Sequence, residues 1–329
     1  QGHVRRLTLE VPRAQDLSAA GRERVPQLFP FEAARCRYEY RRLAQQPAHG
    51  AHRYTLQVSA CDLERLRRDT ELFERIGWVP THAYPAALAL GSLLGAHGQG
   101  AGSVFLLDIG SARSVLSLAV NGEVAFSREI SLGASALTEA LMTQVVVGEQ
   151  PLQLSWEQAE SLKNRLGVPA PEAAPDAVES PLPLPMYCAM LQPVLEQWLE
   201  EIHRTMAFGI QAFRESDAVP SGDPGEAMPT RLLLSGGGSE LVGFEPWLEQ
   251  QLKMPVERVT VGPLHEALRP QGLSLGAFAV CYGLLMSRGA ARLTPPTPAV
   301  HSPGPPDAAP AGKCPGPRRR SSAPRRRRA

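Results

Sequence analysis

The first residues that could do chemistry stand in a short turn after an apolar run. They are Asp108, Gly110, Ser111 and Ser114, and the run Val104–Leu107 precedes them. A carboxylate at the end of a buried strand can hold a hydrated Mg²⁺, a glycine lets the backbone approach a ligand, and hydroxyls donate to phosphate oxygens. These residue types in this order indicate a phosphate-binding turn, although an Asp-Ile-Gly sequence taken alone is equally compatible with an ordinary turn.

A second pair of charged residues follows in Ala-Glu-Ser-Leu-Lys at 159–163. Glu160 and Lys163 are three residues apart, so on a helix they project from one face. The carboxylate can accept hydrogen bonds from ribose hydroxyls, and the ammonium can approach the sugar or the phosphates. Taken alone, the pair also fits an ordinary exposed salt bridge.

A third element is the apolar run Leu232–Leu234, which leads through Ser235 into three consecutive glycines. The glycines are Gly236, Gly237 and Gly238. Without Cβ atoms they allow a flat base to lie against the backbone. The alternative is a flexible connection.

The elements that must position these residues can be predicted from periodicity and turn signals. Residues 103–130 are predicted to form a three-stranded meander, because Asn121-Gly122 between alternating runs favours a tight hairpin turn. Helices are expected at 135–146, at 155–166 with Ser155 and Gln158 as a capping box, and at 244–252. A long helix ending near Arg214 is expected to have Pro193 in its first turn.

Residues 4–84 are predicted to form a separate small unit. Strands at 4–11, 36–43, 54–58 and 78–84 with helices at 16–28 and 62–76 give a split ferredoxin-like order. A helix at 86–94 follows. Further along, a strand at 256–261 and a closing helix at 274–286 complete the predicted α/β arrangement.

Charge is distributed unevenly along the 329 residues. The whole chain carries a formal +1, whereas residues 295–329 hold Lys313 and seven Arg against Asp307, a net +7, which leaves −6 on the other 294 residues. This Pro- and Arg-rich tail is predicted to be disordered. It is either an electrostatic arm for nucleic acid or anionic lipid, or a segment without a specific partner, and the second interpretation is favoured.

Composition excludes several classes of protein. The five cysteines contain no C-x-x-C pair and the eight histidines no ligand spacing, so neither a disulfide framework nor a zinc site is expected. No apolar run reaches the length of a membrane span. A reducing cytoplasm is the simplest expectation. The chain begins at Gln1 rather than Met, which suggests a fragment.

The order of hairpin, A-E-x-x-K helix and strand-Gly-Gly-Gly turn resembles the second lobe of the actin-like ATPase superfamily, which has a ribonuclease H-like fold. Within it the chain resembles most the PilM family of type IV pilus assembly proteins. That likeness is carried by GEVAFSREISLG at 122–133, LSWEQAESLK at 154–163, EIHRT at 201–205, LLSGGGSELVG at 233–243, and VRRLTLEVP with LFPF near the N-terminus.

The resemblance implies a division of the chain into three parts. Residues 1–84 correspond to the inserted subdomain 1C, which takes part in partner binding. Residues 85–294 correspond to the nucleotide-binding second lobe, with the hairpin at 103–130, a helical subdomain at about 154–230 and the strand-glycine-helix element at 231–253. Residues 295–329 lie outside the likeness.

The resemblance also implies a function. The expected role is an ATP- and Mg²⁺-binding scaffold at the inner membrane, whose nucleotide state is linked to binding the cytoplasmic tail of a PilN-like protein. The expected nucleotide-binding residues are Asp108 (through water to Mg²⁺), Gly110, Ser111, Ser114, Glu160, Lys163 and Gly236 to Gly238. Peripheral association with the inner membrane through the partner is expected, and no specific nucleic acid.

Two departures from the family pattern argue against rapid hydrolysis. The family's first Asp-x-Gly hairpin has no counterpart before the 1C-like unit, and Pro85 and Ala86 stand where relatives carry a polar group near the attacking water. The alternatives are a true actin-like ATPase or kinase that lacks its N-terminal segment here, and a degenerate interaction module without nucleotide. FtsA and the secretion protein GspL fit less well, because their membrane-binding segments have no counterpart.

Overall fold

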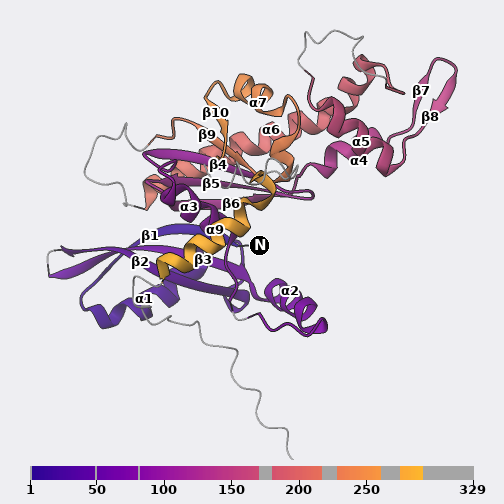
Figure 1. Cartoon of the computed structure of the whole chain (residues 1–329). Coiled ribbons are helices and arrows are strands. Elements are labelled where there is room, and N and C mark those ends of the chain that lie inside the picture. The colour runs from indigo at the N-terminus through magenta and orange to yellow at the C-terminus, as the bar shows by residue number, and fades with distance from the viewer. Residues whose placement is uncertain are drawn as a thin grey trace, which may run out of the picture.

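The fold is described from a computed structural model, which is shown in Figure 1. The description covers residues 2–48, 50–80, 82–169, 180–216, 228–260 and 275–291, with side chains of α9 described over 276–287. The predicted tail at 295–329 lies outside the described residues. The predicted strand at 256–261 and helix at 274–286 each extend by one residue beyond them.

One mixed sheet of eight strands runs through the described chain, in the order β10-β9-β4-β5-β6-β1-β3-β2. Its strands are β1 (His3–Val11), β2 (Cys36–Ala48), β3 (Ala51–Asp62), β4 (Ser103–Ile109), β5 (Ser114–Val120), β6 (Glu123–Ile130), β9 (Leu232–Ser235) and β10 (Val256–Arg258). The strands β10, β9 and β4 are parallel, and the remaining pairs are antiparallel. A separate small hairpin consists of β7 (Val145–Val147) and β8 (Gln150–Leu152).

Helices cover both faces of the part of the sheet that contains β4, β5 and β6. They are α3 (Ala86–Ala96), α4 (Ser135–Leu141), α5 (Trp156–Leu166), α6 (Leu184–Glu215), α7 (Phe244–Leu252) and α9 (Leu275–Ala291). Alternate side chains of β4 point to opposite faces. Phe105 and Leu107 pack into the core with α4, α5 and α6, whereas Val104 and Leu106 pack against α3 and α9. We call this body the lobe.

The predicted meander is confirmed. Asn121 and Gly122 both have positive φ angles, 52° and 79°, as the two-residue turn between β5 and β6 requires. The core residues of β4 are almost fully buried because helices lie over both of its faces. The turn that follows β4 therefore starts from a rigid strand.

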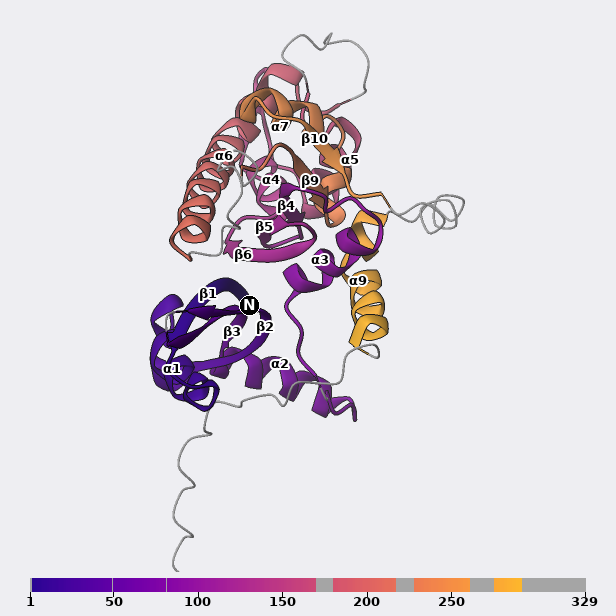
Figure 2. The same ribbon diagram turned by 90° about the vertical axis from the view of Figure 1, so that its left-hand side faces the viewer.

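The N-terminal unit, residues 2–80, has its own core between β1, β3, β2 and the helix α1 (Leu17–Arg24). Figure 2 shows this unit beneath the lobe, with β1 next to β6. The helix α2 (Leu63–Arg75) begins at Asp62, which caps it by accepting from the Arg65 amide, and none of its residues is buried. The unit and the lobe thus have separate cores.

Three details of the predicted elements are wrong. No strand forms among the described residues of 78–84, so the last strand of the split ferredoxin order is missing there, and the side chains of Trp78 and Val79 are exposed. The helix predicted at 135–146 ends at Leu141, because the chain turns into β7. Pro193 lies inside α6 rather than in its first turn; it is on the exposed face, where water can replace the missing backbone donor.

No helix within the described ranges combines the length and apolar character needed to cross a bilayer.

Candidate functional site

A pocket of about 350 Å³ lies where α4, α5 and the turn after β9 meet. Its walls are formed by Ser111, Ala134, Ser135, Glu160, Lys163, Asn164, Gly237, Gly238, Glu240 and Leu241. Five of the residues predicted from sequence are among them: Ser111, Glu160, Lys163, Gly237 and Gly238. Residues from three distant parts of the chain, all singled out by sequence, therefore line one cavity.

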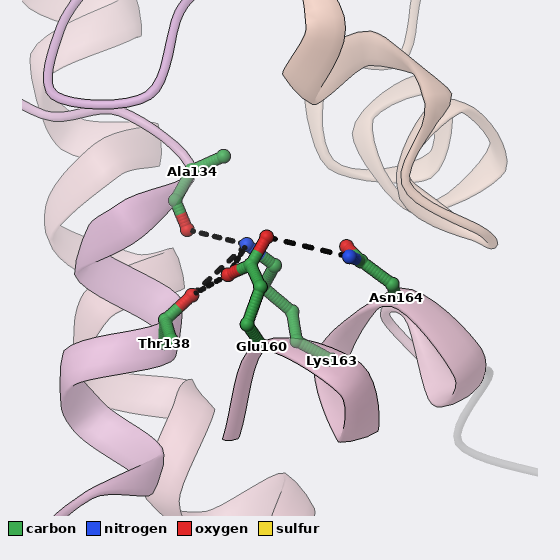
Figure 3. Close-up of polar contacts among 5 residues, drawn as sticks. All are labelled: Ala134, Thr138, Glu160, Lys163 and Asn164. Carbon is green, nitrogen blue, oxygen red and sulfur yellow. Dashed lines mark hydrogen bonds and ion pairs between the residues drawn. The ribbon is translucent and has the colours of Figure 1, made fainter. Parts of the chain in front are cut away.

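The helix α5 carries the charged pair, whose polar contacts are drawn in Figure 3, and both residues line the pocket. Ser155 accepts from the Gln158 amide and the Gln158 side chain accepts from the Ser155 amide, so the predicted capping box fixes where the helix begins. Lys163 Nζ lies 2.6 Å from Glu160 Oε2. The side chain of Lys163 is only 4% exposed, whereas that of Glu160 is 36% exposed. Glu160 is thus the more accessible side chain of the pair and the one that a ligand in the pocket can contact more easily.

Two further groups hold the lysine. Its Nζ donates to Thr138 Oγ1 at 2.9 Å and to the Ala134 carbonyl at 3.2 Å. Thr138 is fully buried, and its hydroxyl donates to Glu160 Oε2. A buried ammonium needs such partners, because an unpaired charge in the protein interior strongly destabilises the folded state.

Sequence reasoning missed Thr138 and Asn164. Asn164 Nδ2 donates to Glu160 Oε1 at 3.3 Å, so both carboxylate oxygens of Glu160 have partners. The one available signal for Asn164 was its position next to Lys163 on the predicted helix. Nothing in the sequence marked Thr138, because its role depends on how α4 packs against α5.

These contacts set the ionisation of Glu160. Partial burial acts to raise its pKa, but hydrogen bonds from Lys163 and Thr138 outweigh burial and hold the pKa below the ordinary value of a glutamate. The carboxylate is therefore charged at neutral pH and can accept hydrogen bonds from a ligand's hydroxyl groups.

The three glycines after β9 have different roles. A Cβ on Gly236, where φ is +83°, would lie 2.3 Å from the Ile109 carbonyl oxygen, and one on Gly238 would lie 2.2 Å from Ile109 Cγ2. A Cβ on Gly237 would meet nothing within 4 Å. Gly236 and Gly238 are thus required by packing against the end of β4, and Gly237 leaves open space on the pocket wall.

Most of the residues predicted to hold phosphate and metal are not among those that line the pocket. Asp108 pairs with Ser235 across β4 and β9; burial raises the pKa of the Asp108 carboxyl, and the neighbouring Ser235 hydroxyl acts in the opposite direction. Ser114 is fully buried and donates to the Leu132 carbonyl at 2.7 Å. The Gly110 amide donates to the Arg113 carbonyl and closes the turn. Of the predicted phosphate residues, Ser111 alone lines the pocket.

Two tests of fit bear on the expected Mg²⁺ and nucleotide. Within the described ranges no group of three or more His, Cys, Asp or Glu side chains is arranged to hold a metal ion directly. The expected contact of Asp108 with Mg²⁺ through water needs no such group and stays a prediction. The donors and acceptors at Glu160, Lys163, Asn164 and Ser111 fit the hydroxyls and anionic groups of a nucleotide.

A second cavity, which we call the groove, has a volume of about 650 Å³ and lies between α2 and the sheet face formed by β2 and β3. Tyr38, Cys61, Leu66 and Phe73 line it, and Tyr84 and Pro85 close one end. Phe73 and Tyr84 are 45% and 47% exposed. Pro85 thus lines the groove and is not among the residues of the pocket.

Solved structures place this architecture in a class. A chain of the PilM–PilN type IV pilus biogenesis complex is 21% identical, with a TM-score of 0.59, over 87% of this chain and 76% of that one. MreB5 of Spiroplasma citri bound to ADP is 13% identical, with a TM-score of 0.51, over 70% and 67%. At these identities the likeness concerns the fold. The mixed sheet with helices on both faces is that of the actin-like ATPases.

The family follows from the sequence match. The family model described as "Type IV pilus assembly protein PilM" matches residues 12–267, and the chain belongs to this family. The predicted family and fold class are therefore confirmed. No curated protein matches the sequence.

Proposed function

We propose that the pocket binds ATP with Mg²⁺ and that the chain serves type IV pilus assembly as a nucleotide-binding scaffold. The observation that carries the proposal is the nearly buried Lys163, held by Thr138 and Ala134 against the partly exposed Glu160. A lysine with three partners is fixed in direction, so a ligand finds the charges already oriented. Binding of ADP by MreB5, which shares the fold, supports the same assignment.

In this proposal each residue acts on a stated part of the ligand. Glu160 accepts from the ribose hydroxyls, Lys163 neutralises negative charge, and Gly237 gives the base room against the backbone. Ser111 donates to a phosphate oxygen, and Asp108 orients the water shell of Mg²⁺. The metal supplies charge neutralisation of the phosphates when bound. Little or no ATP hydrolysis is expected, because the side chains of Pro85 and Ala86 cannot orient or deprotonate an attacking water.

Calorimetric titration tests nucleotide binding. ATP with Mg²⁺, ATP with EDTA, ADP and AMP are each titrated into the purified chain. Saturable binding that weakens without Mg²⁺ supports the proposal, and a phosphate-release assay on the same sample separates a scaffold from a true ATPase. No heat with any nucleotide contradicts the proposal and favours an interaction module. That alternative has its own basis here, since Asp108, Gly110 and Ser114 are all engaged in internal contacts.

We also propose that the groove binds the cytoplasmic tail of a PilN-like inner-membrane protein and that nucleotide state alters this binding. Support comes from the family and from the solved PilM–PilN complex, whose fold this chain shares. The mixture of apolar side chains (Leu66, Phe73, Tyr84) with Arg65 at the groove suits a short extended peptide with apolar anchors. Peripheral association with the inner membrane then follows from the partner.

Two neighbouring residues of α2 provide a matched test of the groove. Phe73 lines the groove and Leu72 does not, although both are exposed apolar side chains, 45% and 60% respectively. Phe73→Asp should weaken binding of a synthetic PilN-tail peptide about tenfold or more in fluorescence anisotropy, and Leu72→Asp should leave binding unchanged. Equal effects of the two variants would contradict the assignment. Repeating the titration in the presence of ATP and of ADP measures whether nucleotide state alters the affinity for the peptide.

A further inference from the structure

The N-terminal unit and the lobe are joined by very few backbone contacts. Strand β1 pairs with β3 through nine residue pairs but with β6 through two, Val4 with Ser127 and Arg5 with Phe126. The eight-stranded sheet is therefore continuous only through this short ladder, which we call the joint. Figures 1 and 2 both show β1 next to β6 at this point.

Arg5 occupies the centre of the joint. Its Nη1 donates to the Ser127 carbonyl at 2.7 Å and to its own neighbour's carbonyl at Val4, 2.9 Å. Its guanidinium lies 4.1 Å from the ring centre of Phe126 and 5.5 Å from that of Phe208. The residue is 8% exposed. These rings and carbonyls replace much of the water that the cation loses.

The replacement is incomplete, because no acidic side chain of the described residues pairs with Arg5. Burial, helped by the nearby charge of Arg128, lowers the pKa of Arg5 to about 10. The two hydrogen bonds and the ring contacts are therefore what holds the cation in place. The joint thus depends on a few contacts of one side chain.

The other contacts across the joint are mostly polar. The Val4 amide donates to Ser127 Oγ at 2.8 Å, and Arg41 of β2 pairs with Glu123 of β6. Thr8 Oγ1 donates to the Ser216 carbonyl, and Gln57 Nε2 donates to the Val124 carbonyl at 2.7 Å. Arg6 lies over the Phe213 ring, with its Nε buried and unpartnered. Apolar packing at the joint is limited to a small cluster that includes Val4, Ala87 and Val124, separate from the cores of the unit and the lobe. A polar contact of this kind resembles an interface between domains that move.

We propose that the joint is a latch that opens while the N-terminal unit and the lobe both stay folded. Opening separates β1 from β6 and hydrates the Arg5 guanidinium. It leaves a free edge on β6 with the rings of Phe126 and Phe208 beside it, a surface that can accept an extended strand. The chain between α2 and α3, whose described residues form neither helix nor strand, is the connection about which the unit moves.

Hydrogen–deuterium exchange without nucleotide or partner tests the latch, so its outcome is independent of the proposed function. If the joint opens separately, amides in 124–128 exchange faster than those of the interior strand β5. Arg5→Met removes the cation–π contact and both hydrogen bonds while keeping the length of the side chain. It should speed exchange in 124–128 about tenfold and leave β5 unchanged.

Arg53→Met is the control, because Arg53 is an exposed arginine of the same unit, paired with Glu10 on the strand β1. It should not change exchange at β6. Phe208→Ala is a second opening variant, since its side chain is 45% exposed and its removal leaves the core of the lobe intact. Both opening variants should increase the radius of gyration in small-angle X-ray scattering.

Two results would overturn the latch. One is equal exchange of β5 and β6 in every variant, because the joint would then open only with the whole lobe. The other is an unchanged exchange rate and radius of gyration in both Arg5→Met and Phe208→Ala.

Discussion

Glu160 and Lys163 lie one turn apart on α5 and share a hydrogen bond of 2.6 Å, yet the lysine is 4% exposed and the glutamate 36%. The asymmetry gives the two residues different roles. Lys163 is held by hydrogen bonds to Thr138 of α4 and to Ala134 just before it. Glu160 can replace water with a ligand while it keeps its ion pair with Lys163. Because the hydrogen bonds of Lys163 are all made within the protein, the lysine is already oriented before a ligand binds.

Lys163→Met should weaken nucleotide binding about 10- to 100-fold, because the positive charge that neutralises the ligand and orients Glu160 is lost, an effect of about 1.5–3 kcal/mol. The free energy of unfolding should also fall, by about 1–3 kcal/mol, because the Ala134 carbonyl and the buried Thr138 hydroxyl lose their donor. Calorimetric titration and urea unfolding measure the two effects. Arg165→Met, an exposed position on the same helix, is the control. Equal affinities in the two variants would contradict the role given to Lys163.

Thr138→Val should destabilise the protein by about 1–3 kcal/mol, because a buried hydroxyl that both accepts from Lys163 and donates to Glu160 is replaced by a methyl group. Thr138→Ser keeps the hydroxyl and should cost less. The pKa of Glu160, followed by NMR, should rise in the valine variant, because one of the hydrogen bonds that lower it is gone. A pKa that stays fixed would show that Thr138 does not act on Glu160.

Asp108→Asn should raise the melting temperature at pH 7 by a few degrees when no ligand is bound. Burial raises the pKa of Asp108, so its ionised form destabilises the folded state above that pKa. As pH falls through the raised folded pKa and then below the unfolded pKa, the carboxyl becomes protonated in both states and the advantage of asparagine disappears. Thermal unfolding across pH measures this. The same variant should lose any dependence of nucleotide binding on Mg²⁺, and a retained dependence would remove Asp108 from the metal site.

Gly236→Ala should destabilise the protein by more than about 2 kcal/mol, because the positive φ and the contact with the Ile109 carbonyl both oppose a side chain. Gly237→Ala should change stability by less than about 1 kcal/mol, since its Cβ would meet nothing within 4 Å. If the base lies against Gly237, this second variant should nevertheless weaken nucleotide binding. Unchanged affinity in a stable Gly237→Ala protein would argue that the base lies elsewhere.

Local signals predicted much of the fold. Ser155 and Gln158 determined where α5 begins, Asn121-Gly122 determined the β5–β6 turn, and α7 has the predicted bounds, between Gly243 and Lys253, both in left-handed conformation. Each of these depends on residues that are close in the chain. The family was likewise accessible, because the spacing of the motifs carries it.

Features that depend on packing could not be predicted in this way. Thr138 reaches its partners only because α4 lies against α5, and nothing in its neighbours indicates this. Helix propensity alone gave no reason for α4 to stop at Leu141. Packing also removes residues that the sequence suggests. Ser114 carries a hydroxyl that could bind phosphate, but this hydroxyl already donates its hydrogen bond to the Leu132 carbonyl.

The position of β9 has a consequence for synthesis of the chain. Strand β9 pairs with the outer edge of β4, but its residues, 232–235, leave the ribosome long after β4, β5 and β6. Until then a nascent chain carries an apolar strand with one edge unpaired, and the wall of the pocket that contains Gly237 does not yet exist. During translation the chain therefore passes through a stage in which the unpaired edge of β4 favours aggregation and the proposed nucleotide pocket is incomplete. This stage ends only when the strand-glycine turn emerges from the ribosome.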